Sequence, residues 1–234
     1  IALGQSQGDP RYEGYAQAAL APWWDLVEPP VPVLILRAML EQRRHDFDAA
    51  LAHLERVLAR QHRHPQALLT KATILGVQGK PDLELESCAE LTSAVEILVE
   101  AACTASAYGL AGRAREGYRL LQEGRRRSPG AEPLLQVWAH TILAELAEQL
   151  GYVAAAEQHF RDALSRARDP YLLGAYADFL LDQDRPGEVL ALLEDESRID
   201  PLLLRLALAE RRLGAAALDE HLALLQDRFD AARR

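Results

Sequence analysis

The 234-residue sequence has a formal net charge of −9, and 49% of its residues are hydrophobic although only 6% are aromatic. This length can bury a sizeable core, and a composition dominated by Ala and Leu favours closely packed helices. No run approaches the roughly 18–20 apolar residues that span a bilayer, and an acidic balance argues against binding a nucleic-acid backbone. The sequence therefore predicts an all-α protein with no membrane span and no nucleic-acid partner.

The N-terminal residues 1–30 are expected to form a capping helix and a linker. Asp9 is the expected N-cap and Pro10 the first-turn residue of a helix that runs to Leu20. A Trp pair and a Pro-rich stretch at 29–32 then separate this helix from the rest of the chain. The sequence begins with Ile1 rather than Met, as expected after removal of an export signal or at the start of an incomplete sequence.

From residue 31 onward the chain repeats one helical pattern. Ala156, Phe160 and Ala163 share one face of a helix, and Gly151 ends the helix before it. The same frame recurs with starts near residues 31, 65, 98, 137, 170 and 200. The fourth repeat follows an insertion near 130–135. Within each repeat we expect two helices joined by a turn, with turns near 44–46, 79–81, 110–113, 150–152 and 183–187.

This pattern resembles the tetratricopeptide-repeat (TPR) family. A small residue recurs midway through the expected helices, as Ala38, Ala50, Ala72, Ala105, Ala144, Ala156 and Ala177. The resemblance implies a right-handed α-solenoid of five to six TPR units preceded by the N-terminal helix, with residues 31–234 as one continuous domain. The second repeat departs from the pattern, since Pro81 begins its second helix and Glu84 replaces the small residue.

The resemblance also implies a concave groove lined by the first helix of each repeat. Carried over position by position, the partner-binding residues are Met39, Gln42, Arg43, Leu69, Thr73, Ser106, Trp138, Thr141, Glu145, Gln149, Tyr171, Asp178, Asp182, Leu204, Leu208 and Arg211. For Trp138 and Tyr171, the sequence is equally compatible with packing in the core and with contact to a ligand. The chain has no Asn, so the carboxylate clamp of chaperone-binding TPR domains is not expected.

Other polar groups have plain structural interpretations. Metal binding is suggested by four His residues, His45, His53, His62 and His64. However, alternate His residues without a Cys or carboxylate pair are more typical of a solvated loop. The run 125–127 is three Arg residues, which suit a helix C-terminus, or alternatively a patch that binds phosphate or an acidic partner. The acidic residues between 178 and 200 are too dispersed for one cation site and are typical of a solvated face.

Cys88 and Cys103 are the only cysteines. The repeat frame places them on antiparallel neighbouring helices, on either side of a reversal near 92–95. In a reducing cytosol they would be buried free thiols, whereas in an exported protein they would form a disulfide. The condition for the bond is a Cα separation below about 7 Å.

The sequence lacks a phosphate-binding Gly loop, a nucleophile elbow and metalloprotease or Cys-x-x-Cys motifs, so no enzyme, catalytic residue, cofactor or metal is predicted. The leading interpretation is a scaffold that binds a protein or peptide in its groove. The alternatives are a metal-binding or enzymatic protein that uses the His residues, and an adaptor that assembles through its convex or terminal surface. The N-terminal segment resembles bacterial TPR proteins that often carry a signal peptide, which favours a periplasmic or exported location over the cytoplasm.

Overall fold

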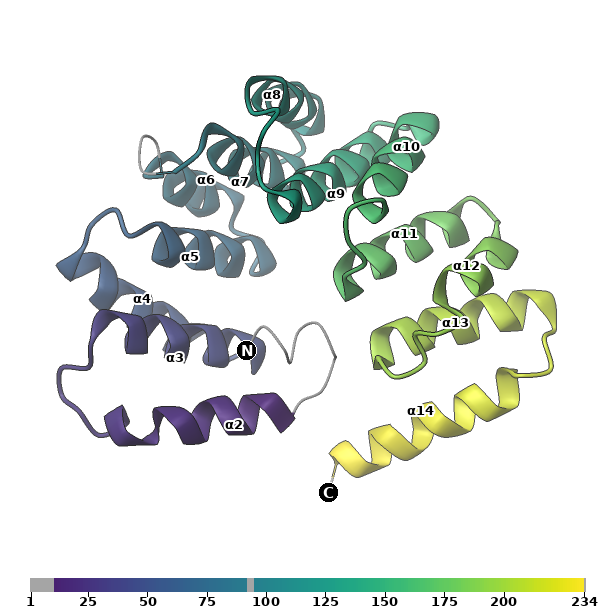
Figure 1. The fold of residues 1–234 in the computed structure, drawn as a ribbon, viewed down its shortest axis with the longest axis horizontal. Coiled ribbons are helices and arrows are strands. Elements are labelled where there is room, and N and C mark those ends of the chain that lie inside the picture. The colour runs from purple at the N-terminus through teal and green to yellow at the C-terminus, as the bar shows by residue number, and fades with distance from the viewer. Residues whose placement is uncertain (1–10, 92–94, 234) are drawn as a thin grey trace. The chain divides into compact units, whose positions relative to one another are not determined.

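The computed structural model describes residues 11–91 and 95–233, and their regular structure is helical, with no strand among them (Figure 1). The contacts divide the chain into two compact units, which we call unit 1 (residues 11–166) and unit 2 (residues 167–234). The boundary lies inside the single domain that the sequence predicted for residues 31–234. No helix in the described ranges combines the length and the apolar character needed to cross a membrane. The predicted N-cap Asp9 and first-turn Pro10 lie outside the described residues.

Unit 1 consists of an N-terminal helix followed by four antiparallel helix pairs. After α2 (Arg11–Leu20) and the short helix η1 (Ala21–Trp23), the pairs are α3 (Val31–Arg43) with α4 (Phe47–Arg60), α5 (Pro65–Val77) with α6 (Pro81–Ala89), α7 (Ile97–Leu110) with α8 (Ala114–Arg127), and α9 (Pro133–Gln149) with α10 (Val153–Leu164). Unit 2 contains two more pairs, α11 (Pro170–Asp182) with α12 (Pro186–Leu193) and α13 (Asp200–Leu213) with α14 (Leu218–Ala232). The predicted all-α class and paired organisation are confirmed.

One helix start differs from the predicted frame. The fourth repeat was expected to begin near residue 137, but α9 begins at Pro133 and is 17 residues long. Pro is favoured in the first turn of a helix, because its fixed φ suits the helix and its missing N–H would have no partner there. Part of the expected insertion near 130–135 therefore lengthens α9, and the connecting loop is 128–132.

The helix pairs from α3–α4 to α11–α12 reverse through the same three-residue turn. The middle residue adopts a left-handed conformation in each, as His45, Gly79, Gly112, Gly151 and Asp184. The N–H of the following residue bonds to a carbonyl five positions back, as from Tyr152 to Ala147 at 2.8 Å. This pattern is the Schellman motif, which satisfies the last carbonyls of the first helix. The turns that the sequence predicted are therefore built on one backbone geometry.

Small residues allow the helices of a pair to approach closely. A Cβ added at Gly117 of α8 would lie 2.8 Å from the Ala105 carbonyl oxygen of α7, and one at Gly124 would lie 2.7 Å from the Ala101 Cβ. Leu98 and Leu121 are fully buried in the same seam. Because no larger side chain fits at these points, small residues determine how closely the two helices pack.

The first helices of consecutive pairs form a continuous row in unit 1. Helix α3 contacts α5, α5 contacts α7, and α7 contacts α9, while each second helix packs beside the first helix of the next pair. Figure 1 shows this succession from α3 to α9. Direct contact between neighbouring first helices identifies this row as the inner one of unit 1. In unit 2, α11 contacts α13 in the same way.

The second pair contains a buried carboxyl group. Glu84 is only 4% exposed, and its Oε2 atom lacks a hydrogen-bond partner. A Cβ added at Gly76 of α5 would lie 2.7 Å from that oxygen, so the glycine makes room for the side chain. Burial raises the pKa of Glu84 to about 7, although a hydrogen bond with Ser106 acts in the opposite direction. Glu84 thus occupies the position where the repeat expects a small residue, and its burial disfavours the charged carboxylate.

Cys88 of α6 and Cys103 of α7 form a disulfide with a Cα–Cα distance of 5.6 Å. This separation meets the geometric condition for the bond. Both residues are buried in the cluster that includes Leu68, Ile74 and Leu91. The bond connects the second helix pair to the third on either side of residues 92–94.

We expect Gly151→Ala to lower the free energy of unfolding by about 1 kcal/mol, because a Cβ is disfavoured in the left-handed conformation. Gly151 has a φ of +72°, and no atom lies within 4 Å of the position that a Cβ would take. The substitution would therefore strain the backbone without a steric clash. Gly130→Ala is the matched control, since its site is equally open and its φ lies outside the left-handed range. Urea denaturation measures both, and equal stabilities would contradict the turn geometry.

Glu84→Gln should stabilise the protein relative to wild type as the pH rises. With a folded-state pKa near 7 against an ordinary 4.5, folded Glu84 retains its proton between these values while the unfolded chain loses it. Wild-type stability therefore falls across this window by up to about 3 kcal/mol, and the Gln variant lacks that loss. Denaturation at pH 5 and pH 8 measures the difference. Glu86→Gln, an exposed change on the same helix, should show no such trend.

Reduction of the disulfide should lower the free energy of unfolding by about 3 kcal/mol, the chain-entropy value for a loop of about 15 residues. Thermal unfolding with and without reductant measures this change. The Cys88→Ser/Cys103→Ser double variant should be less stable than wild type and insensitive to reductant. Two alkylatable thiols in the unreduced, denatured protein would show that the bond is absent.

Candidate functional site

The groove residues predicted in unit 1 all lie on the inner row of first helices, but their exposure differs. Met39 and Leu69 are half-buried and pack against the core cluster of the first two pairs. Arg43 donates from Nε to Glu13 of α2 at 2.6 Å. Thr73 is exposed, and its hydroxyl donates to the Leu69 carbonyl. The N-terminal part of this surface is therefore largely occupied by intramolecular contacts.

The predicted groove residues of the third and fourth pairs include one that the structure corrects. Thr141 is 3% exposed, and its hydroxyl donates to the Val137 carbonyl at 2.9 Å, so it cannot contact a partner. α9 packs against α7, α8 and α10, which leaves few of its positions exposed. Ser106 is half-buried and hydrogen-bonded to Glu84.

α9 retains a mixed exposed stripe. Leu134 is 70% exposed and Trp138 is 37% exposed, and their i, i+4 spacing places them side by side on the helix. Glu145 is half-buried and Gln149 is exposed further along the helix, while Gln42 is half-buried on α3. An exposed aromatic and aliphatic pair followed by polar residues is the composition expected of a surface that contacts a peptide.

Unit 2 has its own exposed residues on its first helices. Tyr171 of α11 is 68% exposed, and Leu204 and Leu208 form an exposed i, i+4 pair on α13. Arg211 is also exposed. The acidic positions divide into two kinds. Asp178 accepts two hydrogen bonds from Arg205, at 2.8 and 2.5 Å. Asp182 is exposed and takes no part in this ion pair.

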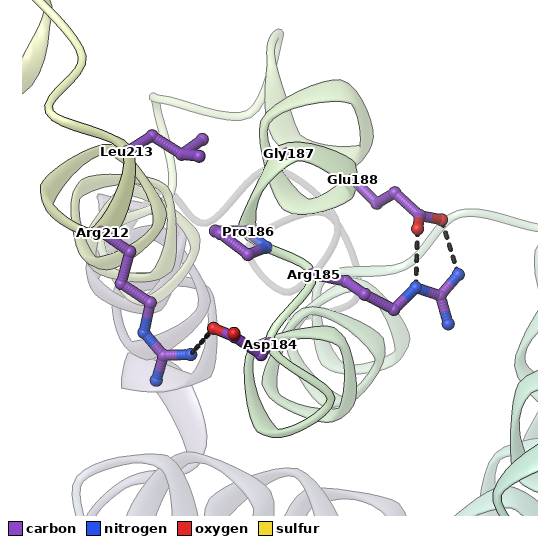
Figure 2. A pocket seen from close by; sticks show the side chains of 7 residues that line it. All are labelled: Asp184, Arg185, Pro186, Gly187, Glu188, Arg212 and Leu213. Carbon is purple, nitrogen blue, oxygen red and sulfur yellow. Dashed lines mark hydrogen bonds and ion pairs between the residues drawn. The ribbon is translucent and has the colours of Figure 1, made fainter.

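A hollow lies in unit 2, between the turn that joins α11 to α12 and the end of α13 (Figure 2). Its volume is about 650 Å³, and its charged lining groups pair with one another. Arg185 donates two hydrogen bonds to Glu188, at 2.6 and 2.7 Å, and Arg212 lies 3.9 Å from Asp184. Because these charges are mutually compensated, the hollow has little electrostatic basis for selecting a ligand.

A basic hollow of about 580 Å³ lies in unit 1 beside the loop that joins α8 to α9. Arg125, Arg126 and Arg166 line it. Arg126 is paired with Glu123, and Arg125 donates to the Gln136 side chain at 3.4 Å. Of the three consecutive Arg residues, two line this hollow and all three lie in the last turn of α8, as a helix C-terminus favours.

The His residues singled out in the sequence are dispersed. His45 lies in a turn, His62 is exposed, and His64 caps α5 by accepting from the Ala67 N–H. His53 is half-buried, and burial lowers its pKa. The metal-binding alternative based on these four residues therefore finds no cluster among the described residues.

A different group of potential ligands comes together at the α9–α10 pair. His140 of α9, His159 of α10 and Asp162 of α10 each place a ligand atom within 4.8 Å of the other two. The two Nδ1 atoms are 3.3 Å apart, and the His159 Nε2 lies 3.1 Å from the Tyr118 hydroxyl of α8. Burial lowers the pKa of His140 to about 4 and also lowers that of His159, and Arg125 acts in the same direction.

Sequence reasoning missed this cluster. The signal available was the i, i+3 spacing of His159 and Asp162, which places both on one face of a helix. A lone His on the preceding helix could not be assigned to the same face without knowledge of how the two helices pack.

Two solved structures resemble this chain. A TPR protein of Thermus thermophilus is 22% identical, with a TM-score of 0.67 over 77% of this chain and 98% of that one. A tetratricopeptide repeat protein from Parabacteroides merdae is 16% identical, with a TM-score of 0.61 over 94% of this chain and 84% of that one. No protein-family model and no curated protein sequence matches. Together with the paired helices and their common turn, these likenesses show that the chain has the fold of tetratricopeptide-repeat proteins.

Proposed function

We propose that the chain is a non-catalytic scaffold that binds a protein partner through its inner row of first helices. The observation that carries this proposal is the exposed pair Leu134 and Trp138 on α9. Apolar surface left exposed on a large aromatic side chain forgoes hydrophobic stabilisation, and Trp is among the residue types enriched at the energetically dominant contacts of interfaces. A peptide or partner helix that covers this pair would remove their apolar surface from water.

The chemistry of the exposed residues narrows the partner. The apolar pair on α9 suits an aliphatic or aromatic anchor, as does the pair Leu204 and Leu208 on α13. Asp182 lies on α11, and Asp178 is already engaged by Arg205. Residues 132–234 carry 11 basic and 19 acidic groups, a net charge of −8. We therefore favour a partner segment with apolar anchors and a positive charge, for which electrostatic attraction would raise the association rate.

The experiment that tests this proposal is selection of peptides from a display library against the 234-residue protein, followed by calorimetry on the selected sequences. Trp138→Ala should weaken binding at least about tenfold, which corresponds to about 1.4 kcal/mol. Leu120→Ala is the matched control, because Leu120 of α8 and Trp138 are both 37% exposed but lie on a second and a first helix, respectively.

Equal losses of affinity in the two variants would reject the inner row as the binding surface. A loss restricted to Leu120→Ala would favour the alternative of assembly through the second helices. Far-UV circular dichroism of both variants establishes that each retains the helical fold of the wild-type protein.

A further inference from the structure

The α9–α10 pair brings three metal-ligand groups together beside the core of unit 1. We propose that His140 Nδ1, His159 Nδ1 and the Asp162 carboxylate bind a divalent transition-metal ion, with Zn²⁺ as the best fit. This proposal is independent of the protein-binding role. Within the described residues, these three form the one group of His, Cys, Asp and Glu side chains with such spacing.

The distances suit a tetrahedral ion. Zn–N bonds of about 2.0–2.1 Å at tetrahedral angles place neighbouring ligand atoms about 3.3 Å apart. The two imidazole Nδ1 atoms are separated by 3.3 Å, and His140 Nδ1 lies 3.7 Å from an oxygen of Asp162. A small rotation of the Asp162 side chain completes a three-ligand set and leaves the fourth position for water. Two imidazoles and one carboxylate are ligands that Zn²⁺ accepts in proteins.

The surroundings hold the ligands in place. His159 and Asp162 are three residues apart on α10, so both face α9. The Nε2 of His159 lies 3.1 Å from the Tyr118 hydroxyl, and a hydrogen bond donated by that nitrogen leaves Nδ1 as the metal-binding atom. His140 is 1% exposed, and its Nε2 is buried without a hydrogen-bond partner. The ring nitrogen of His140 that meets His159 and Asp162 is therefore Nδ1.

The ligand types and the nearby charges favour a transition-metal ion over a hard cation. Imidazole coordinates a metal ion in its neutral form. Arg125 and Arg166 lie close enough to oppose a cation, and the Asp162 carboxylate offsets part of their effect. A hard cation such as Mg²⁺ would gain little from two nitrogen ligands in this field. A transition metal gains enough from the imidazoles to bind. The Asp162 side chain is 39% exposed and provides the entry path.

The site would connect the two functional faces of α9. Residues two apart on an α-helix point in nearly opposite directions. His140 faces α10, so Trp138 lies on the opposite side of α9, where it is partly exposed. A metal at His140 would fix α9 to α10 and thereby hold the helix that presents Leu134 and Trp138.

Isothermal titration of Zn²⁺ into the chelator-treated 234-residue protein tests the proposal. We expect one equivalent to bind and to raise the thermal unfolding midpoint. His159→Ala and, separately, Asp162→Asn should each weaken binding by more than the roughly 10- to 100-fold that loss of an outer hydrogen-bond partner costs. Tyr118→Phe, which removes that outer partner, should lie within this range. Co²⁺ bound in place of Zn²⁺ should show the intense visible absorption of a tetrahedral site.

The matched control is His62→Ala, which removes an exposed imidazole from the loop that joins the first two pairs and should leave Zn²⁺ affinity unchanged. Absence of Zn²⁺ binding by the wild type would overturn the proposal and leave the two Nδ1 atoms in a direct hydrogen bond. Binding that survives both His159→Ala and Asp162→Asn would place the ion elsewhere and overturn it equally. Circular dichroism verifies that each variant is folded, and Asp162→Asn, at a partly exposed position, is the variant that disturbs packing least.

Discussion

Close packing of the two helices of a pair, which is tightest where α8 meets α7 at Gly117 and Gly124, is the constraint on which the rest of this protein depends. At Gly117 and Gly124, added Cβ atoms would come within 3 Å of α7, so the axes are as near as the backbones permit. Such proximity requires the chain to reverse within a few residues, and the Schellman turns provide that reversal from the α3–α4 pair to the α11–α12 pair. The hydrophobic seam between paired helices then supplies the stabilisation that single short helices lack.

Buried polar groups in the seams are accommodated in different ways, as the second and fourth pairs illustrate. Glu84 is buried against Gly76, where the missing side chain provides space. His140 and His159 instead contact each other and Tyr118. Burial disfavours the charged form in both cases, so it raises the pKa of the carboxyl and lowers the pKa of the imidazoles. These departures mark the positions where an apolar side chain would have packed at lower cost.

Packing of the first helices against one another decides which surface remains for a partner. In unit 1 the first helices from α3 to α9 pack against one another and bury many of their side chains. The exposed large apolar side chains of α9 are Leu134 and Trp138. In unit 2, the ion pair between Arg205 and Asp178 connects α13 to α11 and uses part of the acidic charge that composition alone would assign to a partner.

The sequence by itself determined the helical class, the pairing and the turn positions, because small residues, Gly and Pro act locally on backbone conformation. It predicted the position of Glu84 in the frame and the proximity of Cys88 to Cys103. It could not identify Thr141 as buried or Asp178 as paired, since both depend on side chains from other helices. The His140–His159–Asp162 cluster depends equally on the rotation of α9 against α10. Only the tertiary structure decided these points, because the helical repeat fixes which residues share a face but not which neighbouring face they meet.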